Sequence, residues 1–147
     1  MERDKPILEY VTLVIIILVV IGVFFQIKNQ EINFCRKVFT ELAKGAPRAE
    51  KFIAWENLKA VGADIGAAYR NLPDEKERAH YREAFIKNFA LGFRQNRGKV
   101  SAFKHWRLYS REGEKVVVAA DYLGYNKTIL FGLSKRGKSK LISLQWK

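Results

Sequence analysis

The sequence predicts an α+β protein: an N-terminal transmembrane helix, then about three helices packed on a four-stranded antiparallel meander sheet. Three observations carry this prediction. A run of about 21 apolar residues begins at Ile7. Apolar side chains then recur at three- and four-residue spacing as far as the Phe93 region. Beyond Ala102 they alternate along short segments that are separated by glycine-containing turns.

The apolar run, residues 7–27, matches the thickness of a membrane. At about 1.5 Å per residue, a helix of this length crosses a hydrocarbon core of about 30 Å. Residues 24–28 (FFQIK) lack the pair of small residues that a signal peptidase site needs, so we expect an uncleaved anchor after a short tail, residues 1–6. The membrane-spanning residues of this prediction include Ile7, Leu13, Ile17, Val20, Phe24 and Ile27.

Two arguments about the orientation in the membrane oppose each other. Two basic residues precede the span and four follow it closely, which favours a cytoplasmic C-terminal side. That rule weakens for long translocated domains, however, and a tiny tail before a single span commonly leaves the domain outside the cytoplasm. We predict a single-pass cell-membrane protein with an extracytoplasmic C-terminal domain.

Residues 28–45 are expected to form a juxtamembrane amphipathic helix that ends at Gly45, ahead of Pro47. This helix carries the one cysteine of the chain, Cys35, so an intrachain disulfide is excluded. We expect Cys35 to be an ordinary small apolar residue, with an interchain disulfide as the alternative.

Residues 46–147 form the predicted basic α+β domain. A second helix is expected up to Leu72, and its glycines Gly62 and Gly66 each cost about 1 kcal/mol against alanine. We therefore expect another element to pack closely against its backbone. A third helix begins at the capping-box pair Asp74 and Glu77. Its aromatic stripe consists of Tyr81, Phe85, Phe89 and Phe93.

Four alternating segments follow, and the three short turns between them make neighbouring strands antiparallel. Neither face of the last segment is purely polar, so we expect helices on one side of the sheet and a partner on the other. The segments are residues 102–110, 115–123, 128–133 and 139–147.

This order of helices and meander, closed by the strand SKLISLQW, resembles the cystatin-like, or nuclear-transport-factor-2-like, fold. The resemblance covers residues 46–147 and implies a cone whose helices wrap one face of the sheet. Such cones host enzymes, ligand binders and assembly modules. A single span before such a domain also resembles, in architecture, the inner-membrane scaffold component of bacterial type IV secretion systems, which forms periplasmic oligomers.

A pilin-like filament subunit is an alternative, because an apolar helix that runs into an amphipathic one ahead of an antiparallel sheet is also the pilin layout. Glu9 lies early in the apolar run, as the pilin glutamate does. Asp4-Lys5-Pro6 stands where a prepilin site would need glycine, and two further helices precede the sheet.

The resemblance also implies where chemistry would lie. Enzymes of this fold place an Asp or His with Tyr residues inside the cone, and the candidate pocket residues here are His105, Tyr109, Asp121 and Tyr122. Strand alternation puts Asp121 and Tyr122 on opposite faces, which argues against a joint acid–base role. The sequence contains two histidines, no phosphate-binding loop and no nucleophile elbow. We therefore expect no enzyme, no cofactor and no metal.

The charge of the chain is strongly positive, with 27 Lys and Arg against 15 Asp and Glu. Four cations around one predicted turn form a candidate basic contact tip: Lys135, Arg136, Lys138 and Lys140. This tip fits anionic lipid headgroups, at about 1 kcal/mol per cation, or an acidic partner. Aromatics interleave with bases in FKHWRLY, but in a strand that pattern is more typical of one core face and one solvated face, which disfavours nucleic acid.

The function expected from these observations is a membrane-anchored, non-enzymatic interaction module of the cell envelope. It would associate with further copies of itself or dock on an envelope complex. The alternatives are the filament subunit and a membrane-tethered binder or enzyme that uses the cone for a small ligand.

Overall fold

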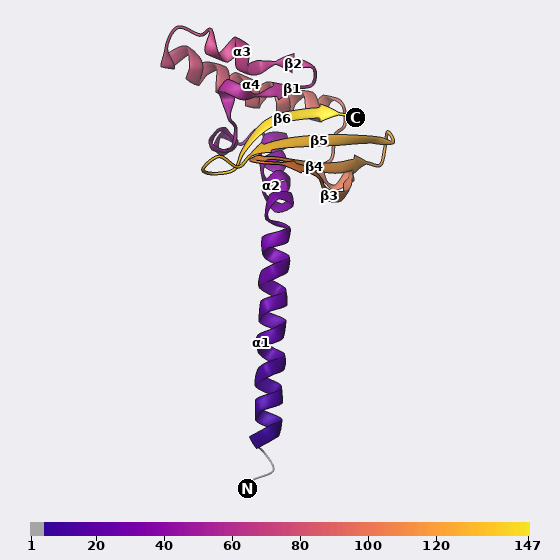
Figure 1. Ribbon diagram of the computed structural model, residues 1–147. Helices are drawn as coiled ribbons and strands as arrows, with labels where there is room; N and C mark the ends of the chain where they lie inside the picture. The colour runs from indigo at the N-terminus through magenta and orange to yellow at the C-terminus, as the bar shows by residue number, and fades with distance from the viewer. Residues whose placement is uncertain (1–4) are drawn as a thin grey trace. The chain divides into compact units, whose positions relative to one another are not determined.

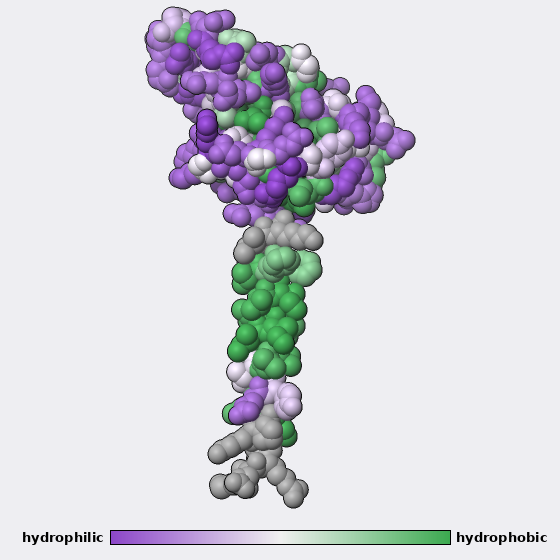
Figure 2. Space-filling model, viewed as in Figure 1, coloured by the Kyte–Doolittle hydropathy of each residue, from purple (hydrophilic) through white to green (hydrophobic). Residues whose placement is uncertain are grey.

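A computed structural model of the chain describes residues 5–147, so most of the predicted tail lies outside the described residues. Helix α1 (Lys5–Lys28) contains the stretch Ile7–Gln26, which has a mean hydropathy of 2.9 and is long and apolar enough to cross a membrane. Every side chain in that stretch is exposed, and Figure 2 shows an unbroken apolar surface along its middle. The predicted span residues in this stretch share that exposure: Ile7, Leu13, Ile17, Val20 and Phe24. The side chain of Ile27 is outside the described part.

Helix α2 (Gln30–Lys44) is the amphipathic helix that the sequence predicts. It ends at Gly45, whose φ of +70° is a left-handed conformation that favours glycine. Its apolar face is buried, with Cys35 at 0% and Phe39 at 2% exposure. A compact unit runs from Glu31 to Lys147. Helix α2 is therefore part of the core of the domain, and not a separate segment ahead of residue 46.

The predicted second helix is wrong. Its residues form five short elements: η1 (Pro47–Phe52), η2 (Trp55–Asn57), β1 (Lys59–Ala60), β2 (Ala63–Asp64) and α3 (Ile65–Arg70). The chain reverses between β1 and β2, where Gly62 has a φ of +81°. Asp64 then starts α3 by accepting a 3.0 Å hydrogen bond from the N–H of Ala67.

Gly66 bears out the expected close approach of another element. A Cβ at this position would collide with the carbonyl group of Glu56, in η2. Gly62 has a different cause, because open space surrounds it and its turn conformation alone requires glycine. The two glycines therefore do not form one helix surface: Gly62 permits the turn between β1 and β2, and Gly66 permits the close contact with Glu56.

Helix α4 (Glu75–Gln95) follows its prediction closely. Asp74 caps it by accepting a 2.9 Å hydrogen bond from the N–H of Glu77. The aromatic stripe faces inward, and its four members all pack against the buried core: Tyr81, Phe85, Phe89 and Phe93.

The domain contains a six-stranded mixed sheet with the order β2-β1-β6-β5-β4-β3 (Figure 1). The antiparallel meander of four strands is confirmed, but the predicted total of four is wrong. The β1–β2 hairpin extends the sheet because Ala60 of β1 pairs in parallel with Leu144 of β6. Strands of two residues are too short to show alternation in a sequence. After η3 (Val100–Ala102), the meander strands are β3 (Phe103–Glu112), β4 (Lys115–Tyr122), β5 (Lys127–Ser134) and β6 (Lys140–Trp146).

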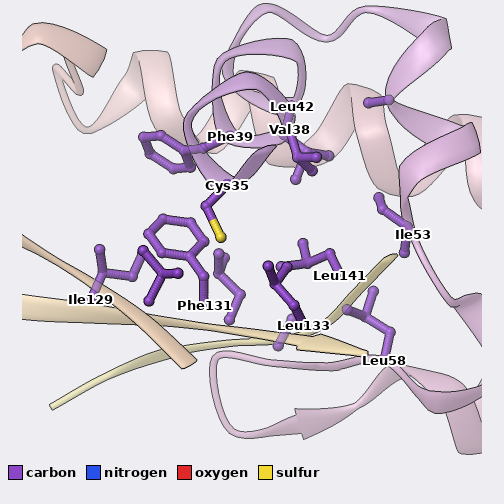
Figure 3. Close-up of a cluster of buried hydrophobic side chains, with 14 of the residues drawn as sticks. Cys35, Val38, Phe39, Leu42, Ile53, Leu58, Ile129, Phe131, Leu133 and Leu141 are labelled. Atoms are coloured by element: carbon purple, nitrogen blue, oxygen red, sulfur yellow. The ribbon is translucent and has the colours of Figure 1, made fainter. Parts of the chain in front are cut away.

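The core lies between α2 and one face of this sheet (Figure 3). Phe39 is at its centre, and its ring lies 4.7 Å from that of Phe103 and 5.4 Å from that of Phe131. T-shaped contacts of this kind add to the hydrophobic stabilisation that burial supplies. The strands β4 and β5 contribute alternate residues to this face, namely Val116, Val118, Ala120, Ile129, Phe131 and Leu133.

Candidate functional site

A hollow of about 550 Å³ lies between α4 and the ends of β5 and β6. Ligand pockets in proteins have volumes of about 300 to 1,000 Å³. We call this hollow the cone pocket, a name taken from the cone that the resemblance predicts. Its lining consists of Phe39, Val61, Asn88, Phe89, Gly92, Phe93, Asn96, Gly98, Tyr122, Tyr125, Lys127, Ile129, Leu144, Gln145 and Trp146.

Helix α4 leaves room for the pocket because glycine stands at position 92. A Cβ at Gly92 would meet nothing within 4 Å, so the space beside it is open. The helix ends three residues later, and the side-chain amide of its C-cap residue, Asn96, donates a 2.8 Å hydrogen bond to the carbonyl of Gly92. The N–H of Gly98 donates to the carbonyl of Phe93 at 2.8 Å and closes the end of the helix.

Aromatic rings form the opposite wall of the cone pocket. Tyr122 stacks on Tyr125 at 5.3 Å between ring centroids, and Trp146 lies 6.4 Å from Tyr122. Tyr125 and Trp146 keep 67% and 44% of their surfaces exposed. Exposed aromatic side chains gathered at a hollow are typical of a binding surface.

Polar groups are few and lie among these apolar walls. Asn88, Asn96 and Gln145 supply amide groups that can donate and accept hydrogen bonds. Lys127 is the one charged side chain among the described lining residues. The pocket can therefore hold an apolar body and favours a negative or hydrogen-bond-accepting group near Lys127.

The predicted pocket residues lie elsewhere, apart from Tyr122. Asp121 precedes Tyr122 on β4 and points to the opposite face of the sheet, which we call the outer face. There it accepts a 2.9 Å hydrogen bond from the Thr128 hydroxyl, and Arg107 and His105 lie 3.1 and 3.2 Å from its carboxylate oxygens. The Thr128 hydrogen bond, with those from Arg107 and His105, lowers the pKa of Asp121 below its ordinary value.

His105 and Tyr109 are also outside the described lining of the cone pocket. His105 has a φ of +54° and lies in a bulge between Lys104 and Arg107, which shifts the alternation of β3. The hydroxyl of Tyr109 accepts a 3.0 Å hydrogen bond from Lys147. Both His105 and Tyr109 are exposed to solvent, so their surroundings do not provide the buried site that acid–base catalysis needs.

The basic contact tip lies at the end of the sheet where β5 turns into β6. Lys135 donates a 2.6 Å hydrogen bond to the carboxylate of Glu31, and Arg111 donates to the same oxygen at 2.9 Å. Glu31 is 5% exposed, and burial acts to raise its pKa. The hydrogen bonds from Lys135 and Arg111, with its backbone hydrogen bond, outweigh burial and hold the pKa of Glu31 below its ordinary value.

Residues 5–147 contain no group of three or more His, Cys, Asp or Glu side chains that could hold a metal ion. Cys35 is fully buried, and burial together with the charge of Glu31 raises the pKa of its thiol. A buried, protonated thiol is a poor nucleophile, and this position is closed to an interchain disulfide in the folded domain.

Sequence reasoning found one lining residue of the cone pocket, Tyr122, and missed the others because the lining comes from five separate segments. The trace that it leaves in the sequence is Gly92 within the aromatic stripe (FALGF), together with the tyrosines of DYLGYNK.

Comparisons with protein-family models, with curated proteins and with solved structures found no match to this chain.

Proposed function

We propose that the protein is a single-pass membrane-anchored binding module that holds a small amphipathic molecule in its cone pocket. The observation that carries this proposal is the pocket itself, an aromatic hollow of about 550 Å³ between α4 and the sheet. The ligand that fits has an apolar body for the wall of Phe93, Tyr122 and Trp146. Its head is a carboxylate or a similar anion, within reach of Lys127.

The binding role is supported by the chemistry of the lining. The titratable side chains of the described lining are Lys127, Tyr122 and Tyr125. This set lacks the pairing of a nucleophile or acid with an orienting base on which most enzymes rely. We therefore propose binding without catalysis.

Anchoring through α1 completes the proposal. The stretch Ile7–Gln26 would cross the bilayer and hold the domain at its surface, on the extracytoplasmic side. We also propose the cystatin-like cone as the fold of the domain. Its support is the long antiparallel meander with α2 and α4 against one face, joined through β6 to a short hairpin.

A pocket-filling variant tests the proposed function. Phe in place of Gly92 would project into the open space beside α4, while Phe in place of Leu91 adds the same ring on the exposed side of the helix. The full chain is reconstituted in lipid nanodiscs with a dansyl-labelled C11 carboxylic acid, and energy transfer from tryptophan to dansyl is measured. We expect transfer above that of empty nanodiscs in the wild type and in Leu91→Phe, and its loss in Gly92→Phe.

Equal energy transfer in all three proteins, with unfolding temperatures that show them folded, would refute the pocket as the binding site.

The preference for an anionic head group has its own test. Lys127→Met should weaken binding of the dansyl acid and leave binding of the matching dansyl alcohol unchanged. Equal losses for the acid and the alcohol would refute the role of Lys127.

The outer face of the sheet favours a second candidate, an assembly module that pairs with a further copy. Val117 is partly exposed on this face, whereas its neighbours Ala119 and Leu130, which lie directly opposite each other on β4 and β5, are already buried within the domain. Arg107 and Asp121 on the same face provide both signs of charge, as a self-complementary two-fold interface requires. Light scattering of the solubilised full chain should then give twice the monomer mass, and Val117→Glu should reduce it to the monomer mass. A monomer at high concentration would exclude this candidate.

A further inference from the structure

We propose that one end of the sheet is a docking edge for the anionic phospholipid headgroups of the bilayer that α1 spans. This edge comprises the β3–β4 and β5–β6 turns, and we call it the basic edge: Arg111, Lys115, Lys135, Arg136, Lys138 and Lys140. The inference rests on the anchoring proposed above and is independent of the cone pocket.

The two turns of the basic edge are held together and to the start of α2. The backbone N–H of Lys135 donates a 2.8 Å hydrogen bond to the carbonyl of Glu114, which joins the turns. The carboxylate of Glu31 accepts from Arg111 and from Lys135, and its side chain is only 6% exposed. Glu31 therefore fixes the position of the basic edge relative to the first turn of α2.

The covalent chain keeps Glu31 close to the membrane, whatever arrangement the helix α1 and the domain adopt. Glu31 follows Gln26, the end of the apolar stretch, by five residues. Five residues span at most about 18 Å when fully extended and about 8 Å when helical. The headgroup layer accounts for about 5 to 8 Å of that distance. The cations bound to Glu31 are thus held within about 10 Å of the headgroup layer.

The charge of the basic edge is suited to an anionic surface. Its six cations stand against Glu31, Glu112 and Glu114, which leaves a net charge of +3. Arg111 and Lys135 are engaged by Glu31, and Arg136 lies 3.5 Å from Glu114. Among the described residues, Lys115, Lys138 and Lys140 have no ion-pair partner and are exposed. These three ammonium groups are free to bind phosphate oxygens.

The opposite end of the sheet provides a contrast. The β4–β5 turn, residues 123–126, contains no charged residue and instead exposes Leu123 and Tyr125. The end of the sheet that is tied to the membrane-proximal turn of α2 carries three unpaired lysines and two further cations in its β5–β6 turn, whereas the opposite end has Lys104 and Lys127 on the strands beside an uncharged turn. Lipids fit this charge better than a soluble acidic protein, because the chain keeps Glu31, to which the basic edge is bound, within about 18 Å of the end of the apolar stretch.

The experiment measures how close each end of the sheet comes to the headgroups. The full chain carries one fluorophore, at Ser139→Cys in the basic edge or at Gly124→Cys at the opposite end. Cys35 is buried and does not compete for the label. Quenching by a headgroup-attached acceptor is recorded in nanodiscs of pure phosphatidylcholine and in nanodiscs with one third phosphatidylglycerol.

We expect stronger quenching at position 139 in the phosphatidylglycerol discs, and loss of the difference in 1 M salt, where the Debye length falls to about 3 Å. Each near-surface lysine should shift the ratio of docked to undocked domain about fivefold. The triple variant Lys115→Gln, Lys138→Gln, Lys140→Gln should therefore lose the effect. Its matched control, Lys59→Gln, Lys76→Gln, Lys104→Gln, removes equal charge elsewhere and should keep it.

Quenching at position 139 that is independent of phosphatidylglycerol would overturn the proposal, as would equal responses of the two triple variants. A response that is larger at position 124 than at position 139 would also overturn it. Failure of the chain to enter nanodiscs would instead refute the anchoring, and it is recognised separately by the absence of discs containing protein.

Discussion

Replacing Gly92 by alanine should stabilise the domain by about 0.5 to 1 kcal/mol. Glycine in a helix interior costs about 1 kcal/mol against alanine. Gly92 lies close to the end of α4, where helices fray, so the stabilisation can be as small as about 0.5 kcal/mol. The added methyl group would meet nothing within 4 Å, so no clash offsets the gain. For a unit that runs from Glu31 to Lys147, a gain of this size raises the unfolding temperature by roughly 2 to 5 °C.

The assay is thermal unfolding of the full chain in detergent, followed by tryptophan fluorescence, because Trp55 and Trp106 pack in the domain whereas α1 contains no tryptophan. Gly66→Ala is the matched control. The same methyl group would there meet the carbonyl group of Glu56, so this variant should unfold at a lower temperature. If Gly92→Ala lowered the unfolding temperature, the pocket beside α4 would not be open as described, and if Gly66→Ala raised it, the close contact with Glu56 would be wrong.

Three further predictions concern the core and its charged neighbour. Phe39→Ala removes the ring that contacts Phe103 and Phe131 and should cost about 3 to 5 kcal/mol in urea unfolding; a loss below about 1 kcal/mol would contradict its central position. Because the pKa of Glu31 is lowered in the fold, its contribution to stability is present above its ordinary pKa of 4.5 and is lost as pH falls through the folded value. Glu31→Gln should therefore be less stable than wild type at pH 7, by about 1.5 to 3 kcal/mol, and the gap should narrow in unfolding measurements below pH 4.5; a constant gap would refute the assignment. Cys35 should react with a thiol reagent only when the domain unfolds, so labelling in native buffer at the rate of a free thiol would show that it is not buried.

The long periodic elements could be predicted from the sequence. In α4, each member of the aromatic stripe meets the core, and Asp74 alone fixes the start of the helix. The meander followed from alternation and from turns that contain Gly113, Gly124 and Gly137. These features depend on local spacing, which a sequence displays directly.

The remaining features depend on contacts between distant segments. The β1–β2 hairpin exists because β6 offers an edge to Ala60, so helical spacing in residues 47–72 was misleading. The bulge at His105 reset the alternation of β3 and placed this residue beside Asp121. The cone pocket is defined by space that side chains leave empty, and spacing along a chain contains no information about such space.

The central position of β6 has a consequence for how the protein is made. This strand joins the meander to the β1–β2 hairpin, yet it leaves the ribosome after every other strand of the sheet. Until then β1 and β5 have unpaired edges, which in other proteins invite pairing with neighbouring chains. Helix α1 emerges first and can enter the bilayer long before the sheet closes. While β6 is still being made, the edges of β1 and β5 would therefore be open to a chaperone, even if α1 has already entered a bilayer.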